Sequence, residues 1–220
     1  MKKSLIIILL CALVSVMTIS CNHSDTKAQI EKCIEEGDFT KAKQLNKKLE
    51  YGGMKLKICK AQVSSLIDKG EFNLAADIAK EDADYGVYYE NLMGKLVQLY
   101  VSNPQGLLMA LSSIQFPKDG NSCYWNGEYE VFYKEDLNKV YSEYNNYVKQ
   151  LAIYAKANDD TEYVKKVSVL LKPLYKKVKG KVREWSNKMQ KDVEVDAMVW
   201  EGTPTDYSQA DQIKKEIGIK

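Results

Sequence analysis

The sequence predicts an all-α protein, and three observations carry this prediction. Apolar residues recur three and four positions apart through most of the 220 residues, which is the spacing of a helix face. A block of the first half is repeated at a constant offset of 33 residues. The second half contains one long run with a continuous apolar seam. Together they predict repeated helix pairs followed by a bundle of long helices.

The internal repeat comprises residues 27–45 and 60–78, which align without a gap. In the first copy Gly37 ends one helix, because glycine adopts a left-handed conformation at the least cost. Asp38 then begins the next helix, where its carboxylate suits the exposed amides, and Ala42 permits close helix contact. The second copy repeats this scheme with Gly70, Glu71, Phe72, Ala75 and Ile78. Each copy is therefore expected to be a helix–turn–helix unit.

The turns at Gly37–Ala42 and Gly70–Ala75 resemble those of tetratricopeptide repeats, in which Gly, an acid, an aromatic residue and a later Ala recur with a period near 34. Ile30 and Val63 depart from that pattern, since a small residue is usual there. The resemblance implies an α-solenoid of tetratricopeptide-like pairs over residues 21–116, with a groove for peptides or partner proteins.

A third, degenerate helix pair is expected before the repeat region ends. Its helices are Val87–Ser102 and Gly106–Ile114, with a break at Asn103-Pro104. Three pairs are about the number that a stable stack needs.

Residues 117–130 are expected to form an aromatic loop or a short β-hairpin near 123–130. Asn126-Gly127 lies between aromatic and alternating residues, which is a strong hairpin pattern. Tyr124, Trp125 and Tyr129 either contact a ligand or pack the loop onto the core, and packing is the commoner use of such rings.

Residues 131–220 are expected to be a C-terminal helical region packed on the repeats. Val131–Ala157 is predicted to be one helix, and a second should run from about Glu162 towards Met189, kinked or ended by Pro173. Asp192–Asp196 alternates, which suits a short extended piece, and a last helix is expected near Ser208–Ile217. The seam of the first helix consists of Leu137, Tyr141, Tyr144, Val148, Leu151 and Ala155.

Residues 161–191 hold ten basic residues against two acidic ones. On a helix, Val178, Val182, Trp185 and Met189 would form an apolar stripe among the lysines. Such a helix either docks on an anionic membrane or an acidic partner, or packs its stripe while the lysines face water.

The first twenty-one residues differ from the rest of the chain. Lys2 and Lys3 precede an apolar run that is short for a membrane-spanning helix, and Ile19-Ser20-Cys21 follow this run. This segment resembles a bacterial lipoprotein signal peptide, because these last three residues match the end of the lipoprotein box. The resemblance implies that residues 1–20 are cleaved and that acyl chains such as palmitate on Cys21 hold the protein on the membrane. Asn22, where Asp would favour the inner membrane, points to the outer membrane, on either its periplasmic or its surface face.

Composition excludes several classes of function. Without residues 1–20, thirty basic and thirty acidic residues balance, so bulk charge gives no reason to expect a nucleic-acid partner. The only histidine, His23, lies in the tether, which argues against histidine-based catalysis. Cys33, Cys59 and Cys123 show no Cys-x-x-Cys spacing. Cys33 is expected to be a small core residue, while Cys33 and Cys59 would form a disulfide only if their helices are neighbours with suitable geometry. We expect no cofactor and no metal.

These features predict a membrane-tethered, non-catalytic protein-interaction (scaffold) lipoprotein of the bacterial envelope, with a protein partner there. The expected contact residues are Tyr88, Tyr89, Tyr124, Trp125 and Tyr129. One alternative is a glycan-binding surface lipoprotein, since fifteen tyrosines and three tryptophans could stack on sugars. The other is a hydrolase with paired carboxylates, although the acids occur in no distinctive motif.

Overall fold

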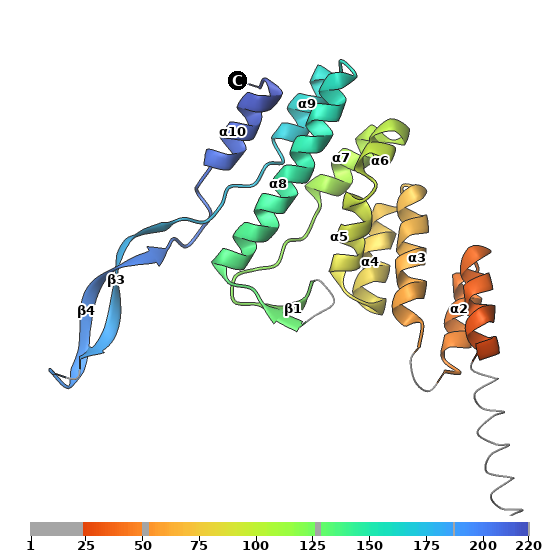
Figure 1. Cartoon of the computed structure of the whole chain (residues 1–220), viewed down its shortest axis with the longest axis horizontal. Helices are drawn as coiled ribbons and strands as arrows, with labels where there is room; N and C mark the ends of the chain where they lie inside the picture. The colour runs from red at the N-terminus through yellow and green to blue at the C-terminus, as the bar shows by residue number, and fades with distance from the viewer. Residues whose placement is uncertain (1–23, 50–52, 126–128, 187, 220) are drawn as a thin grey trace, which may run out of the picture. The chain divides into compact units, whose positions relative to one another are not determined.

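The computed structural model describes residues 24–49, 53–125, 129–186 and 188–219 (Figure 1). The chain is mostly helical, as predicted, and also contains antiparallel strand pairs. It divides into two compact units between Gly94 and Lys95. This division falls inside the stretch 21–116 that was expected to be one repeat region. Cys21 lies outside the described residues.

The first unit consists of consecutive helices joined by short turns. Residues 24–35 are helical, and the helices that follow are α2 (Phe39–Asn46), α3 (Lys55–Asp68), α4 (Phe72–Asp82) and α5 (Tyr85–Met93). The first four helices form the two pairs that the internal repeat predicts, because each pair turns at a glycine of one repeat copy.

The two repeat turns close with the same hydrogen bonds, 33 residues apart. The amide of Gly37 donates to the carbonyl of Ile34 at 3.1 Å, and that of Asp38 to the carbonyl of Cys33 at 2.8 Å. The amides of Gly70 and Glu71 donate in the same way to the carbonyls of Ile67 and Leu66, both at 2.9 Å. Both glycines have positive φ, 75° and 77°. This double closure is the Schellman motif, which requires a left-handed residue at the glycine position.

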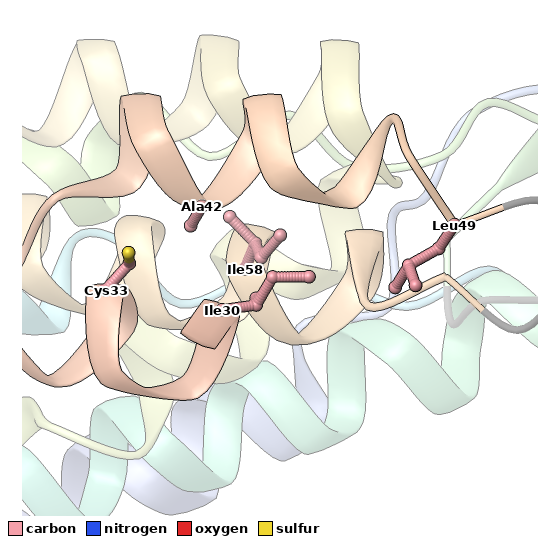
Figure 2. Close-up of a cluster of buried hydrophobic side chains, with 5 residues drawn as sticks. All are labelled: Ile30, Cys33, Ala42, Leu49 and Ile58. Carbon is pink, nitrogen blue, oxygen red and sulfur yellow. The ribbon is translucent and has the colours of Figure 1, made fainter. Parts of the chain in front are cut away.

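The core of the first pair is small and made of the residues that the repeat places inward. Figure 2 shows the cluster, which comprises Ile30, Cys33, Ala42, Leu49 and Ile58. Ile58 belongs to α3, so the first pair buries its apolar side against the second pair. Ion pairs also join equivalent helices: Glu31 with Lys57 at 2.5 Å, Lys60 with Glu90 at 3.7 Å, and Lys43 with Asp82.

The expected third helix pair contains one break in addition to the predicted one. The helix expected over Val87–Ser102 is interrupted at Gly94 and Lys95, and becomes α5 and α6 (Leu96–Ser102). The predicted break at Asn103-Pro104 is confirmed. The side chain of Asn103 accepts the amide of Gly106 at 3.0 Å, and Pro104 begins α7 (Pro104–Ser112), where its missing amide costs nothing.

The second unit is organised around one long helix, α8 (Lys134–Ala157). Five of the six residues of its predicted seam are each at most 1% exposed, namely Leu137, Tyr144, Val148, Leu151 and Ala155, while the sixth, Tyr141, is partly exposed. The carboxylate of Asp160 accepts the amide of Tyr163 and caps α9 (Thr161–Ser168). Helix α10 (Ser208–Ile217) has the predicted bounds, and both α9 and α10 pack on α8 (Figure 1).

The short hairpin predicted near 123–130 is confirmed as β1 (Ser122–Tyr124) paired antiparallel with β2 (Tyr129–Val131). Its proposed Asn126-Gly127 turn lies outside the described residues. The amide of Gly120 donates to the carbonyl of Phe132 at 2.7 Å, which joins the loop before β1 to the residue directly after β2.

The prediction of a helix from Glu162 to Met189 is wrong beyond α9. Residues Lys177–Ser186 form strand β3, which pairs antiparallel with β4 (Lys191–Trp200) over ten residue pairs. The lysines and valines of this segment alternate with a period of two, and valine favours strands. Pro173 and Gly180 also disfavour a helix. The C-terminal region is therefore not wholly helical, and the extended piece expected at Asp192–Asp196 is part of β4.

Candidate functional site

The predicted contact residues Tyr88 and Tyr89 are buried, with 1% and 5% of their surfaces exposed. Helix α5 is buried on nearly every side, since Tyr85, Gly86 and Val87 are buried too. Burial also raises the pKa of the Tyr88 hydroxyl. These rings serve the core, so the expectation that they contact a partner is wrong. The sequence could not show this, because tyrosine occurs both in cores and at interfaces.

Trp125 packs the aromatic loop onto the second unit. It is 3% exposed and lies 6.5 Å from the ring of Phe116, whose ring meets those of Tyr144 at 5.0 Å and Tyr141 at 5.2 Å. The packing role, rather than ligand contact, is therefore the one that the structure supports for Trp125. The side chains of Tyr124 and Tyr129 lie outside the described part of the structure.

The β3–β4 hairpin extends away from the helices of its own unit (Figure 1). Directly opposite residues of an antiparallel pair share a face, and successive residues alternate between faces. Val178 is opposite Val199, Gly180 opposite Ala197, and Val182 opposite Val195. With Val193, these residues make one apolar side, which we name the valine face. Its valines and Ala197 are partly exposed.

The opposite side of the hairpin, which we name the charged face, carries acids on β4 across from bases on β3. Lys181 lies opposite Asp196 and pairs with Glu194 at 3.6 Å, and Lys177 lies over the ring of Trp200 at 5.0 Å. Opposite charges across a ladder stabilise it. The charged face comprises Lys177, Lys179, Lys181, Arg183, Trp185, Asp192, Glu194, Asp196, Met198 and Trp200.

Two asparagines of α8, one heptad apart, hold the segment that leads into the hairpin. The amide group of Asn138 donates to the carbonyl of Tyr175 at 2.8 Å, and its oxygen accepts the amide of Tyr175 at 2.7 Å. Asn145 makes the same pair of bonds with Lys172, at 2.8 and 2.7 Å, and a third with Gln209 of α10 at 2.9 Å. The base of the hairpin is thus fixed to the helices, while β3 and β4 pack mainly on each other.

An open hollow of about 560 Å³ lies where the start of α8 meets the end of β4. Tyr133 is 63% exposed there, and Trp200 is partly exposed. Asp119, Lys134, Glu135, Asp136 and Lys139 complete the lining. Rings beside carboxylates offer stacking surfaces and hydrogen-bond acceptors in one place.

The acidic and cysteine side chains are the candidate metal ligands of this chain. Among the described residues, no group of three or more His, Cys, Asp or Glu side chains converges in a way that could hold a metal ion. Hydrogen bonds from Lys165, Ser208 and Lys149 lower the pKa values of Glu162, Asp206 and Glu216, respectively. A general acid needs the opposite shift. Cys33 and Cys59 are buried free thiols, so Cys33 is a core residue as predicted and the two cysteines form no disulfide with each other.

No family model matches this chain, and no curated protein or solved structure matches it either. None of the described helices is both long and apolar enough to cross a bilayer. Sequence reasoning missed the β3–β4 hairpin, although the alternation of lysine and valine from Lys177 to Arg183 could have revealed it.

Proposed function

We propose that this chain is a membrane-tethered, non-catalytic protein-interaction lipoprotein of the bacterial envelope, held by acyl chains on Cys21, and that its hairpin is the main contact surface. The observation that carries the proposal is the valine face. A two-stranded ribbon is marginally stable in water by itself. It is stabilised when a third strand pairs with one of its edges or when another layer packs on its apolar side.

Nothing else among the described residues of the second unit supplies that cover. No helix of this unit packs along β3 and β4, and the internal stretches outside the description are at most three residues long. The segment before residue 24 is expected to leave with the signal peptide, apart from the short tether. We propose that the cover comes from another molecule.

The helix pairs of the first unit support the same function at a second place. Their matching turns and the ion pairs between equivalent helices fit a tetratricopeptide-like solenoid, which we propose as the finer architecture of residues 24–94. Such a stack forms a groove for peptides or partner proteins, and we propose this groove as the second contact surface.

The test is a pull-down from detergent-solubilised envelopes with the lipidated full chain as bait. We expect specific co-purification of a protein, this chain itself included, and its loss when residues 178–199 are replaced by a two-residue turn. Cys21→Ser should move the protein from the membrane fraction to the soluble fraction. Undiminished capture by the shortened variant, or no capture at all, would contradict the proposal.

A glycan-binding function is the second candidate, and the hollow at Tyr133 and Trp200 is the observation that favours it. Titration calorimetry with envelope oligosaccharides should then show binding that Tyr133→Ala abolishes. Tyr207→Ala is a matched control, because Tyr207 is also exposed but does not line the hollow. Sugar binding without protein capture would replace the interaction proposal.

A further inference from the structure

The valine face carries charged residues only at its two ends, and their signs alternate around it. The amide of Glu201 donates to the carbonyl of Lys176 at 3.1 Å, so these two residues continue the pairing at the base. Near the tip, Glu184 lies opposite Val193, and Lys191 lies opposite Ser186. The β3 side thus has Lys176 at the base and Glu184 near the tip, whereas the β4 side has Glu201 at the base and Lys191 near the tip. We name these four residues the corners of the valine face.

This pattern is complementary to itself. If a second hairpin is stacked face to face about a twofold axis, each corner lysine lies over or beside a corner glutamate of the other copy. This holds whether the two hairpins point the same way or opposite ways, because either rotation exchanges positive and negative corners. Between the corners the face is uncharged and made of small side chains, which suits sheet-on-sheet packing about 10 Å apart.

Other occupants fit this surface less well. Hydrocarbon cannot satisfy the free backbone edges of a two-stranded ribbon, so the face does not insert into the membrane core. Edge-to-edge addition of a second copy, β3 against β3 or β4 against β4, places like charges side by side on the charged face. Stacking through the valine faces leaves both charged faces in water.

We propose that the occupant of the valine face is the valine face of a second copy of this chain, in a twofold-symmetric pair of hairpins. This inference rests on the proposed interaction function and names its partner. An isologous contact of this kind closes after two copies and forms no fibre.

The size of the contact sets its strength. A ten-residue ribbon is about 35 Å long and about 10 Å wide, so two stacked faces bury roughly 700 Å² in total. Stable complexes bury about 1,200 Å² or more, and the pair is therefore weak and dependent on concentration. Tethering both copies to one membrane raises their effective concentration and favours the pair there.

The test uses the full-length lipidated chain in its host membrane, with a photo-crosslinking amino acid at Val193 on the valine face. Met198, on the charged face of the same strand, is the matched control position. Irradiation should give a covalent homodimer from Val193, identified by mass spectrometry, and little from Met198. A Val193 adduct with a different protein only would overturn the second copy as occupant while supporting the proposed function. No adduct from Val193 would overturn this inference and leave the pull-down to decide the function.

Paired substitutions on the two faces of the hairpin test which face makes the contact between the two copies. Val182→Thr with Val195→Thr changes one opposite pair of the valine face, keeps β-branched residues in both strands, and should lower the homodimer yield about fivefold or more. Lys179→Thr with Met198→Thr changes an opposite pair of the charged face and should leave the yield from Val193 unchanged. Equal losses in both double variants would contradict the assignment of the face.

Charge reversal tests self-recognition. Glu184→Lys alone should lower the homodimer yield, because a lysine then meets a lysine of the other copy. Reversing all four corners, with Lys176→Glu, Glu184→Lys, Lys191→Glu and Glu201→Lys, restores the alternating pattern and should restore the yield. A partner other than a second copy would be repelled by the fourfold variant, so a yield that stays low overturns the proposal.

Discussion

Val199 packs over Gly180 across the β3–β4 ribbon. A Cβ atom at Gly180 would lie 2.5 Å from Cγ2 of Val199, much closer than such atoms approach one another. The two residues are diagonal neighbours in the ladder, because Gly180 is opposite Ala197 and Val199 is opposite Val178. The glycine therefore provides the space that the valine occupies, which keeps the centre of the valine face closely packed.

We expect Gly180→Ala to loosen the hairpin without unfolding the helices. Valine is stiff at χ1 and cannot easily move away, so the local cost should be about 1–3 kcal/mol. Hydrogen exchange should become faster for the amides of β3 and β4 and stay unchanged in α8. Gly202→Ala is the control, because nothing lies within 4 Å of a Cβ there. Equal effects of the two substitutions would show that the Val199 contact is unimportant.

Asn145 should be among the most sensitive polar positions of the second unit. It is fully buried and makes three hydrogen bonds, two of them to the backbone of Lys172. Asn145→Ala leaves those backbone groups without partners and should lower the free energy of unfolding by about 3 kcal/mol, measured by urea denaturation. Asn138→Ala should cost less, because Asn138 is partly exposed and water can replace its two bonds.

Gly37→Ala should destabilise the first unit by about 1 kcal/mol through backbone strain alone. The φ of Gly37 is 75°, and nothing lies within 4 Å of a Cβ there, so no clash contributes. Gly37→Asn should cost less, since asparagine adopts the left-handed region more readily than alanine. The measurement is the urea midpoint followed by circular dichroism. A larger loss for Asn than for Ala would contradict the left-handed turn.

Cys59 should make the stability of the first unit depend on alkaline pH. Burial, and then the charge of Asp82, raises the pKa of this thiol from its ordinary value of 9.0 to about 11. In the unfolded chain the thiol ionises near pH 9, while in the folded chain it stays neutral. Its contribution to stability is therefore complete below pH 9 and is lost as the pH rises towards 11.

The measurement compares urea midpoints at pH 8 and pH 10.5 for the parent protein and Cys59→Ala. Buried tyrosines such as Tyr144 also have raised pKa values and lower the stability of both proteins at high pH. The part that is due to Cys59 is the extra fall in the parent. If both proteins lose the same stability between the two pH values, the thiol is not the group responsible.

The repeat pairs and the long helix were predictable because their conformation depends on residues that are close together in the sequence. Gly37 and Gly70 each mark a turn that only a flexible residue closes, and the seam from Leu137 to Ala155 keeps one helical period for five turns. The segment from Val178 to Met189 was misread because its valines and Trp185 also fit a helical stripe. Pairing with β4, which is a separate segment of the chain, decides between the helical period and the strand period.

By itself the sequence determined the positions of most helices, the two repeat turns, the short hairpin near residue 123 and the lack of any histidine after His23. Only the tertiary structure decided which aromatic rings are available to a partner. Tyr88 and Trp125 are buried, while Tyr133 and Trp185 are exposed, although all four are aromatic residues. The reason is physical: local spacing fixes backbone conformation, whereas the burial of a ring and the pairing of a strand depend on segments that meet only after folding.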